Sequence, residues 1–185
     1  PANYKDTTWR LYPGMYPGGL KLLGGSFLLE PGVYYLGGGG LEITGVGTYT
    51  QTVDAATSTY GGGVLFYNTE LPNSRLQSAA PSPLGDIKLD GSSANINLLP
   101  LDASSGFYQI FNGLVIYQDR NFAYAGDDLT INGNVSIGMD VRGTIYLPDG
   151  DVKVNGNLGG LVMDQCISKT FDALGNGGDI MALKE

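Results

Sequence analysis

The stretch GTIYLPDGDVKVNGN (143–157) contains the two patterns that recur along this chain. Its first part, GTIYL (143–147), is a glycine followed by apolar and aromatic residues. Its second part, DVKVNGN (151–157), alternates apolar and polar residues, as a strand does when only one of its faces is buried. β-Branched and aromatic residues favour strands, so the stretch predicts two short strands in succession.

Both patterns recur in a fixed order. The glycine-led strings are GVYYL (32–36), GVLFY (63–67), GLVIY (113–117), GTIYL (143–147) and GLVMD (160–164). The alternating strings are LEITG (41–45), DIKLDG (86–91), DLTINGN (128–134), DVKVNGN (151–157) and, more loosely, DIMALK (179–184). Each glycine-led string precedes an alternating one, five times over.

This order predicts an all-β fold, and within that class a right-handed parallel β-helix. In a β-helix, like strands of successive turns stack above one another, so each kind of string would form one face. The leading glycine permits the tight corner that a side chain would obstruct. We expect inward ladders from the following pairs, or from the opposite parity in each string: Val33 and Tyr35, Val64 and Phe66, Leu114 and Ile116, Thr144 and Tyr146.

The spacing of the strings is uneven, which predicts irregular turns and long loops in a single domain over 1–185. Gly113 and Gly143 are 30 residues apart, whereas Gly143 and Gly160 are only 17 apart. The Pro- and Ser-rich segment 68–85 predicts a protruding loop. Residues 1–25 are expected to cap the N-terminal end, and 175–185 to form the last turn or the other cap, because an open solenoid end exposes apolar ladders.

An antiparallel β-sandwich is the alternative fold. The stretch LTINGNVSI (129–137) is a strong signal for a two-residue hairpin, and a sandwich of hairpins would use the same residue types. The repeated order of the two strings favours the β-helix, since a sandwich has no reason to repeat it.

Composition excludes several classes of function. The formal net charge is −8 and the ten Lys and Arg residues are scattered, which argues against nucleic acid and against an anionic membrane surface as partners. The chain has no histidine, so Ser-His and Cys-His nucleophile pairs are impossible. The single cysteine, Cys166, lies in an apolar run and is expected to be a buried structural thiol. No apolar run is long enough to span a membrane, and the start at Pro1 suggests a processed product or an excised domain.

Several stretches resemble a known family. PGVYYLGGGGLEITG, GLVIYQDRN, DLTINGN, GTIYLPDGDVKVNGN and GLVMDQC occur here in the order typical of bacterial Tad/Flp pilus-assembly (TadG-like) surface proteins. The resemblance covers roughly residues 30–170, and GLVIYQDRN and GTIYLPDGDVKVNGN carry most of it. It implies an extracellular Gly- and Asn-rich β-helix at the cell surface, and it implies no activity.

The cluster Gln118, Asp119, Arg120 and Asn121 is the sharpest candidate site. Polysaccharide lyases also use parallel β-helices, and an arginine with a carboxylate-bound calcium could serve such chemistry. Adjacent strand residues point to opposite faces, so Asp119 and Arg120 are expected to form a structural corner instead. The same role is predicted for Asn132, Gly133, Asn155 and Gly156, where Asn-Gly supplies positive φ and stacked Asn side chains share hydrogen bonds.

Two further groups of residues are candidate sites. Asp127, Asp128, Asp140, Asp149 and Asp151 are weak candidates for calcium, although Asp before a strand is ordinary turn chemistry, and no cofactor is expected. Exposed rings could stack on sugars, and the candidates are Trp9, Tyr12, Tyr16, Tyr34, Tyr35, Tyr60 and Tyr67. The sequon Asn134-Val135-Ser136 is a short match of low specificity.

These features predict a non-catalytic extracellular module of a bacterial surface or pilus-like appendage. Its role would be structural or adhesive, and its partners would be further copies of itself or other surface proteins. The alternative is a carbohydrate-binding or polysaccharide-lyase-like β-helix of the tail-spike type, with glycans as partners. A cytoskeletal polymer of the bactofilin kind would require more even turns than these.

Overall fold

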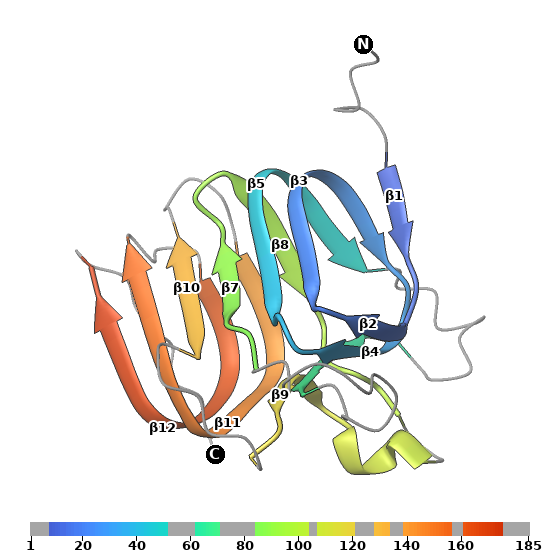
Figure 1. The fold of residues 1–185 in the computed structure, drawn as a ribbon. Coiled ribbons are helices and arrows are strands. Elements are labelled where there is room, and N and C mark those ends of the chain that lie inside the picture. Colours follow the sequence, from blue (N-terminus) through green and yellow to red (C-terminus); the bar gives the residue numbers. More distant parts are fainter. Residues whose placement is uncertain are drawn as a thin grey trace, which may run out of the picture.

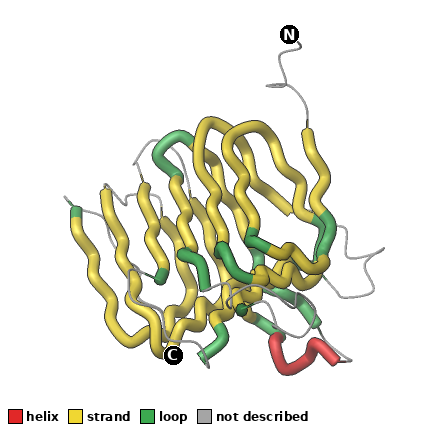
Figure 2. The backbone as a smooth tube through the Cα atoms, in the orientation of Figure 1, coloured by secondary structure: helices red, strands yellow, loops and turns green. Residues whose placement is uncertain are grey.

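The computed structural model describes residues 8–51, 62–70, 84–103, 107–120, 128–133, 139–156 and 161–175. This part of the chain is all-β, with one short 3₁₀ helix, η3 (Phe107–Phe111) (Figures 1 and 2). The strands are β1 (Thr8–Leu11), β2 (Gly14–Pro17), β3 (Leu20–Leu29), β4 (Gly32–Gly37), β5 (Leu41–Gln51), β6 (Val64–Thr69), β7 (Ile87–Asp90), β8 (Ala94–Leu98), β9 (Leu114–Gln118), β10 (Leu129–Gly133), β11 (Met139–Gly156) and β12 (Leu161–Leu174).

Every pairing between these strands is parallel, and the pairings form three rows. Row A joins the start of β3, the start of β5, β7, β10 and the ends of β11 and β12. Row B joins β1, the ends of β3 and β5, β8 and the starts of β11 and β12. Row C joins β2, β4, β6, β9 and the middles of β11 and β12. The antiparallel sandwich is therefore wrong.

The described chain visits the rows in the constant order B, C, A, and we call each passage a circuit. The circuits span 8–23, 26–44, 47–90, 94–133, 139–156 and 161–174. Because β5 and β11 each run from one row into another, the pairings β5–β7–β10–β11–β8 also close into a five-membered ring. The first and last circuits lie at opposite ends of the molecule (Figure 1).

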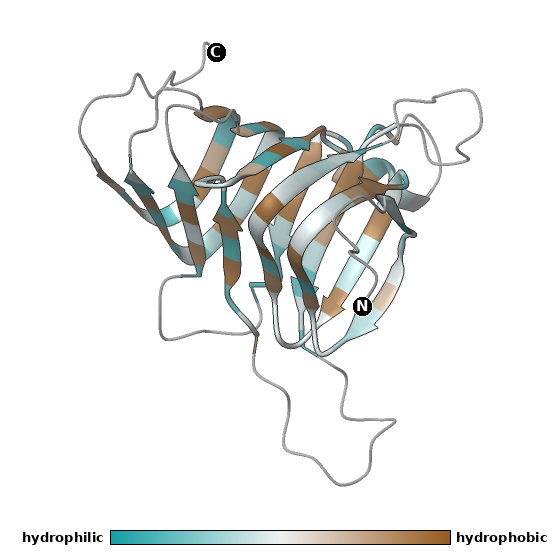
Figure 3. Cartoon of the chain, turned by 90° about the horizontal axis from the view of Figure 1, so that it is seen from above, coloured by the Kyte–Doolittle hydropathy of each residue, from teal (hydrophilic) through white to brown (hydrophobic). Residues whose placement is uncertain are grey.

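One apolar core lies inside the three rows. Apolar and polar residues alternate along most strands (Figure 3), and the apolar ones of all three rows pack into one cluster. In row A, a single ladder runs through Leu20, Leu41, Ile87, Leu129 and Val152 and ends at Phe171. Burying a side chain of this size contributes about 1.5–3 kcal/mol, so these ladders are the main stabilisation of the stack.

The structure confirms the grouping of strings for four of each kind. The glycine-led strings at 32–36, 63–67, 113–117 and 143–147 stack in row C, and the described residues of the alternating strings at 41–45, 86–91, 128–134 and 151–157 stack in row A. The fifth glycine-led string was wrongly grouped, because residues 161–163 pair with 139–141 in row B. The string 179–184 lies outside the described residues.

The inward parity of row C differs between strings. Phe66 and Ile116 face the core in the first of the two parities that the strings allow, and Tyr34 and Ile145 face it in the opposite parity. Val33 instead packs in a second cluster outside row C, with Leu65, Leu101 and Ala103. The segment that includes η3 covers this outer surface and so buries residues on both sides of the sheet.

The structure revises the expected boundaries. Asn68 and Thr69 belong to β6, so the predicted loop 68–85 includes two strand residues, and 71–83 lie outside the described part. The described residues of the predicted cap 1–25 form the first circuit itself. Of the predicted C-terminal segment only Gly175 is described, directly after β12.

Candidate functional site

Gln118 lies in a buried polar network between rows C and A. Its Nε2 donates a hydrogen bond to Asp128 Oδ1 (2.7 Å), and its Oε1 accepts one from Asn68 Nδ2 (3.3 Å). Asp128 Oδ2 accepts a further bond from the backbone N–H of Asp151 (2.9 Å). The network connects three successive circuits. Because the side chains of Asn68, Gln118 and Asp128 are all buried, removing one partner would leave another without a hydrogen bond and destabilise the fold.

Asp119 and Arg120 contact different neighbours. The backbone N–H of Asp119 donates to Asn68 O (2.9 Å), and its Oδ2 accepts from Thr69 Oγ1 (3.3 Å), both on the preceding circuit. The guanidinium of Arg120 donates to the Tyr146 hydroxyl and lies over the Tyr146 ring, on the following circuit. These contacts direct the acid and the base to opposite neighbours in the stack. Asn121 lies outside the described residues.

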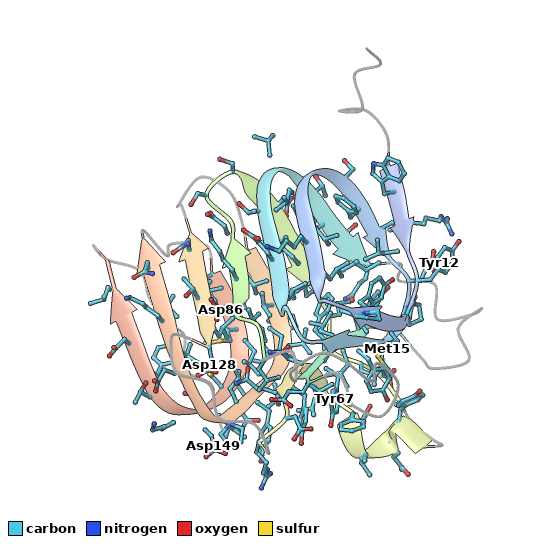
Figure 4. The ribbon with its side chains drawn as sticks, viewed as in Figure 1. Tyr12, Met15, Tyr67, Asp86, Asp128 and Asp149 are labelled. Atoms are coloured by element: carbon cyan, nitrogen blue, oxygen red, sulfur yellow. The ribbon has the colours of Figure 1, made fainter. Side chains whose placement is uncertain are left out.

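Four tyrosines form a continuous stack on the outside of row C, which we call the outer tyrosine row: Tyr35, Tyr67, Tyr117 and Tyr146. The ring centroids of successive members are 5.2, 4.8 and 5.4 Å apart, and the last two pairs are stacked. Phe111 of η3 meets the rings of Tyr67 and Tyr117 edge-on. Tyr67 and the exposed Met15 lie on the same side of the molecule (Figure 4).

The hydroxyl groups of Tyr35 and Tyr67 remain protonated at neutral pH. Burial, and then the neighbouring Tyr108 hydroxyl, raise the pKa of Tyr35 to about 12. Burial also raises the pKa of Tyr67 to about 12, helped by the charge of Asp119 and by Tyr117 and Tyr35. A phenol with so high a pKa cannot act as a general base near pH 7. The row can donate hydrogen bonds along its edge, while its ring faces are largely occupied by one another.

The calcium candidates occupy different environments. Asp128 is buried in the amide network, whereas Asp149 is exposed, and the two are labelled separately in Figure 4. Asp151 Oδ1 accepts a hydrogen bond from Thr170 Oγ1 (2.6 Å), and Asp140 Oδ1 lies 2.6 Å from Arg142 Nε. Asp127 lies outside the described residues. Within the described ranges, no three His, Cys, Asp or Glu side chains are grouped to hold a metal ion.

The Asn-Gly positions lie where row A leads into row B. Asn155 Nδ2 donates to Asn132 Oδ1 (3.2 Å), and Gly133 pairs in register with Gly156. Gly156 has the predicted positive φ (+108°), a conformation that side chains disfavour, whereas the same prediction was wrong for Gly133. The residues predicted for this corner are therefore stacked on adjacent circuits.

Cys166 is half-buried at the last circuit, in register with Ile145. Burial raises the pKa of its thiol, which opposes thiolate formation and hence nucleophilic chemistry.

The aromatic candidates divide into three groups. Trp9 and Tyr12 are exposed on the first circuit, whereas Tyr34 is fully buried and Tyr16 stacks on it. Only Tyr35 and Tyr67 belong to the outer tyrosine row, and Tyr60 lies outside the described residues. Sequence reasoning missed Tyr117 and Tyr146, although a tyrosine three or four places after the leading glycine in four of the glycine-led strings is a signal for them.

Comparisons of the chain with protein families, with curated proteins and with solved structures gave no match. In the described part of the chain, no helix is long and apolar enough to cross a membrane.

Proposed function

We propose that the chain is a right-handed parallel β-helix that serves as a non-catalytic structural or adhesive module on the outside of a bacterial cell. The constant order of the three rows around one core supports the β-helix. Right-handed connection is the general rule for parallel strands joined by a crossover. The resemblance to Tad/Flp pilus-assembly proteins supports the surface setting.

One observation carries the proposal: the polar side chains best suited to chemistry contact neighbouring circuits. Gln118 bonds to Asn68, Asp128 to the backbone N–H of Asp151, Asp119 to Thr69, and Arg120 to Tyr146. Groups held in this way stabilise the stack, and a catalytic pair would instead converge on one point in space. We therefore assign Gln118, Asp119 and Arg120 a structural role.

A carbohydrate-binding module is the second candidate, favoured by the outer tyrosine row with Asp119 and Arg120 beside it. Sugars bind aromatic residues through the ring face. In the outer tyrosine row the faces pack against neighbouring rings, and Arg120 lies over Tyr146. The edge of the row offers hydroxyl groups alone, which makes this candidate the weaker of the two.

The two candidates predict different responses to ligand. We expect no binding on a polysaccharide array, no depolymerisation, and no change in Tm on adding calcium or a chelator.

Asp128→Ala should lower the free energy of unfolding by about 3 kcal/mol, because Gln118 Nε2 and Asp151 N–H both lose a buried partner. Asp119→Ala should cost about 1 kcal/mol, and the exposed Asp149→Ala should have almost no effect.

Saturable binding of a polysaccharide, weakened by Tyr146→Ala or Arg120→Ala, would overturn this proposal in favour of the second candidate. The surface setting is tested separately by protease treatment of intact cells that produce the natural protein. Loss of the protein from intact cells is the expected result, and full protection until lysis would contradict it.

A further inference from the structure

The exposed large apolar side chains gather at the two ends of the molecule. The described residues include nine of them, and Val46 and Ile110 are the two that lie elsewhere. The first circuit carries Trp9, Tyr12, Met15 and Leu23, and the last circuit carries Ile167, Phe171 and Leu174. Apolar groups gathered on two defined surfaces indicate interaction sites.

The same two circuits expose strand edges. Among the described strands, β12 pairs with β11 alone, and β1, β2 and the start of β3 each pair on one side only. An edge of this kind presents backbone N–H and C=O groups that can pair with another chain. Because all rows are parallel, the first circuit of a second copy could follow β12 with every strand in the same direction.

The register of row A specifies which residues would then meet. One line of partners runs through Lys21, Glu42, Lys88, Thr130, Lys153 and Asp172. Continuing it by one step places Lys21 of a second copy beside Asp172, so opposite charges meet. Two residues further along, Leu23, which is 62% exposed, meets Leu174, which is 57% exposed.

Rows C and B give the same complementarity. In row C the line Met15, Tyr35, Tyr67, Tyr117, Tyr146 and Ile167 continues with Met15 of the second copy beside Ile167, and both are exposed. In row B, Leu161 meets Trp9 and Met163 meets Leu11. Each of these contacts pairs apolar residues.

We propose that the last circuit of this chain binds the first circuit of a second copy, in the register that continues rows A, B and C. This inference rests on the proposed structural function and names the partner and the surfaces. The two surfaces differ from each other, so the contact is heterologous and does not close on a pair: it extends into a filament.

Exposed positions at the ends provide the first test. The full chain is followed by sedimentation velocity from about 1 µM to about 1 mM, a range that covers weak association. We expect the mean mass to rise with concentration.

Leu174→Asp and Leu23→Asp should each raise the dissociation constant at least tenfold, roughly 1.4 kcal/mol, because each places a carboxylate in the contact. Val46→Asp is the matched control, since Val46 is 78% exposed in the corner of β5 between the second and third circuits; it should assemble like the wild type.

Cross-linking tests the register. In a variant with Met15→Cys and Ile167→Cys, and with Cys166→Ser to remove the native thiol, oxidation should produce a ladder of covalent multimers. Paired parallel strands bring such residues within the Cα separation that a disulfide requires. Met15→Cys with Leu174→Cys is the control, because these residues lie in different rows and should cross-link far less.

The outcomes separate this inference from the proposed function. A folded wild type that stays monomeric at every concentration overturns the inference and leaves the structural function standing. Equal loss of assembly in Leu174→Asp and Val46→Asp overturns it too, as does equal cross-linking in the two double-cysteine variants. Polysaccharide binding by a non-assembling chain would overturn both.

Discussion

Tyr35 and Tyr67 are acids whose surroundings hold them in the neutral form. Each contributes a half-buried ring to the outer tyrosine row, and burial is the largest cause of their raised pKa values. Tyr67 is also close to the negative charge of Asp119, which further opposes its ionisation. The packing of the outer tyrosine row is therefore compatible with neutral hydroxyl groups on Tyr35 and Tyr67, and ionisation of either would disrupt it.

This environment predicts a loss of stability at high pH. The ordinary tyrosine pKa is 10.0 and the folded values are about 12, so the folded protein binds these protons more tightly than the unfolded chain does. Their contribution is fully present below pH 10 and is lost as the pH rises through 12. Chemical denaturation across this range should show a falling free energy of unfolding. The fall should be smaller for Tyr35→Phe/Tyr67→Phe.

The exposed Tyr12 provides the control for that measurement. Tyr12→Phe removes a hydroxyl group from a ring that is 60% exposed, and it should leave the slope unchanged. If both variants flatten the slope equally, the tyrosines of the outer row are not its source.

Among the elements, the strands of row C depend on the corners that precede them. Gly63 and Gly113 lead into β6 and β9, and both have positive φ. A Cβ at Gly63 would lie 1.8 Å from Pro100 O, whereas nothing lies within 4 Å of a Cβ at Gly113. The two positions thus share a backbone conformation and differ in the space around it.

Alanine at these two positions separates strain from close packing. Gly113→Ala should lower the free energy of unfolding by about 1–2 kcal/mol, the cost of a left-handed conformation for a residue with a side chain. Gly63→Ala should cost about 3 kcal/mol or more, because the backbone of the next circuit must also move. Equal costs in urea denaturation would show that the contact with Pro100 relaxes freely.

Rows A and C could be predicted from the sequence because their strands are short and each follows a recognisable punctuation. Row B could not be predicted in full, because two of its strands are continuations of long elements: GGSFLL (24–29) within β3 and GVGTYTQ (45–51) within β5 lack a separate start signal. The parity of row C was also inaccessible. Both faces of row C are buried, because η3 and its flanking residues cover its outer face. GVYYL is therefore apolar at every position after the glycine, and its sequence does not show which residues face the core.

The candidate site was partly predictable for a related reason. Gln118 and Asp119 are polar residues at the end of an apolar string, which marks a corner. Asn68 is 50 residues away from Gln118, and only the stacking of circuits brings the two together. Asp128 is 10 residues away on the same circuit, across the corner between rows C and A. The outer tyrosine row depends in the same way on register between circuits, which no local pattern reports.

At the scale of the whole molecule, every pairing between the described strands joins successive circuits, so the first and last circuits should open more readily than the middle ones. Hydrogen exchange of the dilute chain should therefore show the weakest strand protection in β1, β2 and β12, and the strongest in β7 and β10. If copies join end to end, protection of β12 and β1 should rise with protein concentration while that of β7 stays constant. A uniform change in all strands would indicate a general effect on stability instead.

The chain has a single tryptophan, Trp9, and the structure places it on β1 with 49% of its surface exposed. The indole emission of the unmodified protein therefore reports on one end of the molecule and is insensitive to the other circuits. Emission near that of free indole in water indicates an open first edge, and a shift to shorter wavelength indicates that the edge has been covered. The protein thus contains its own optical probe of that edge, which can be read in a cuvette without a label.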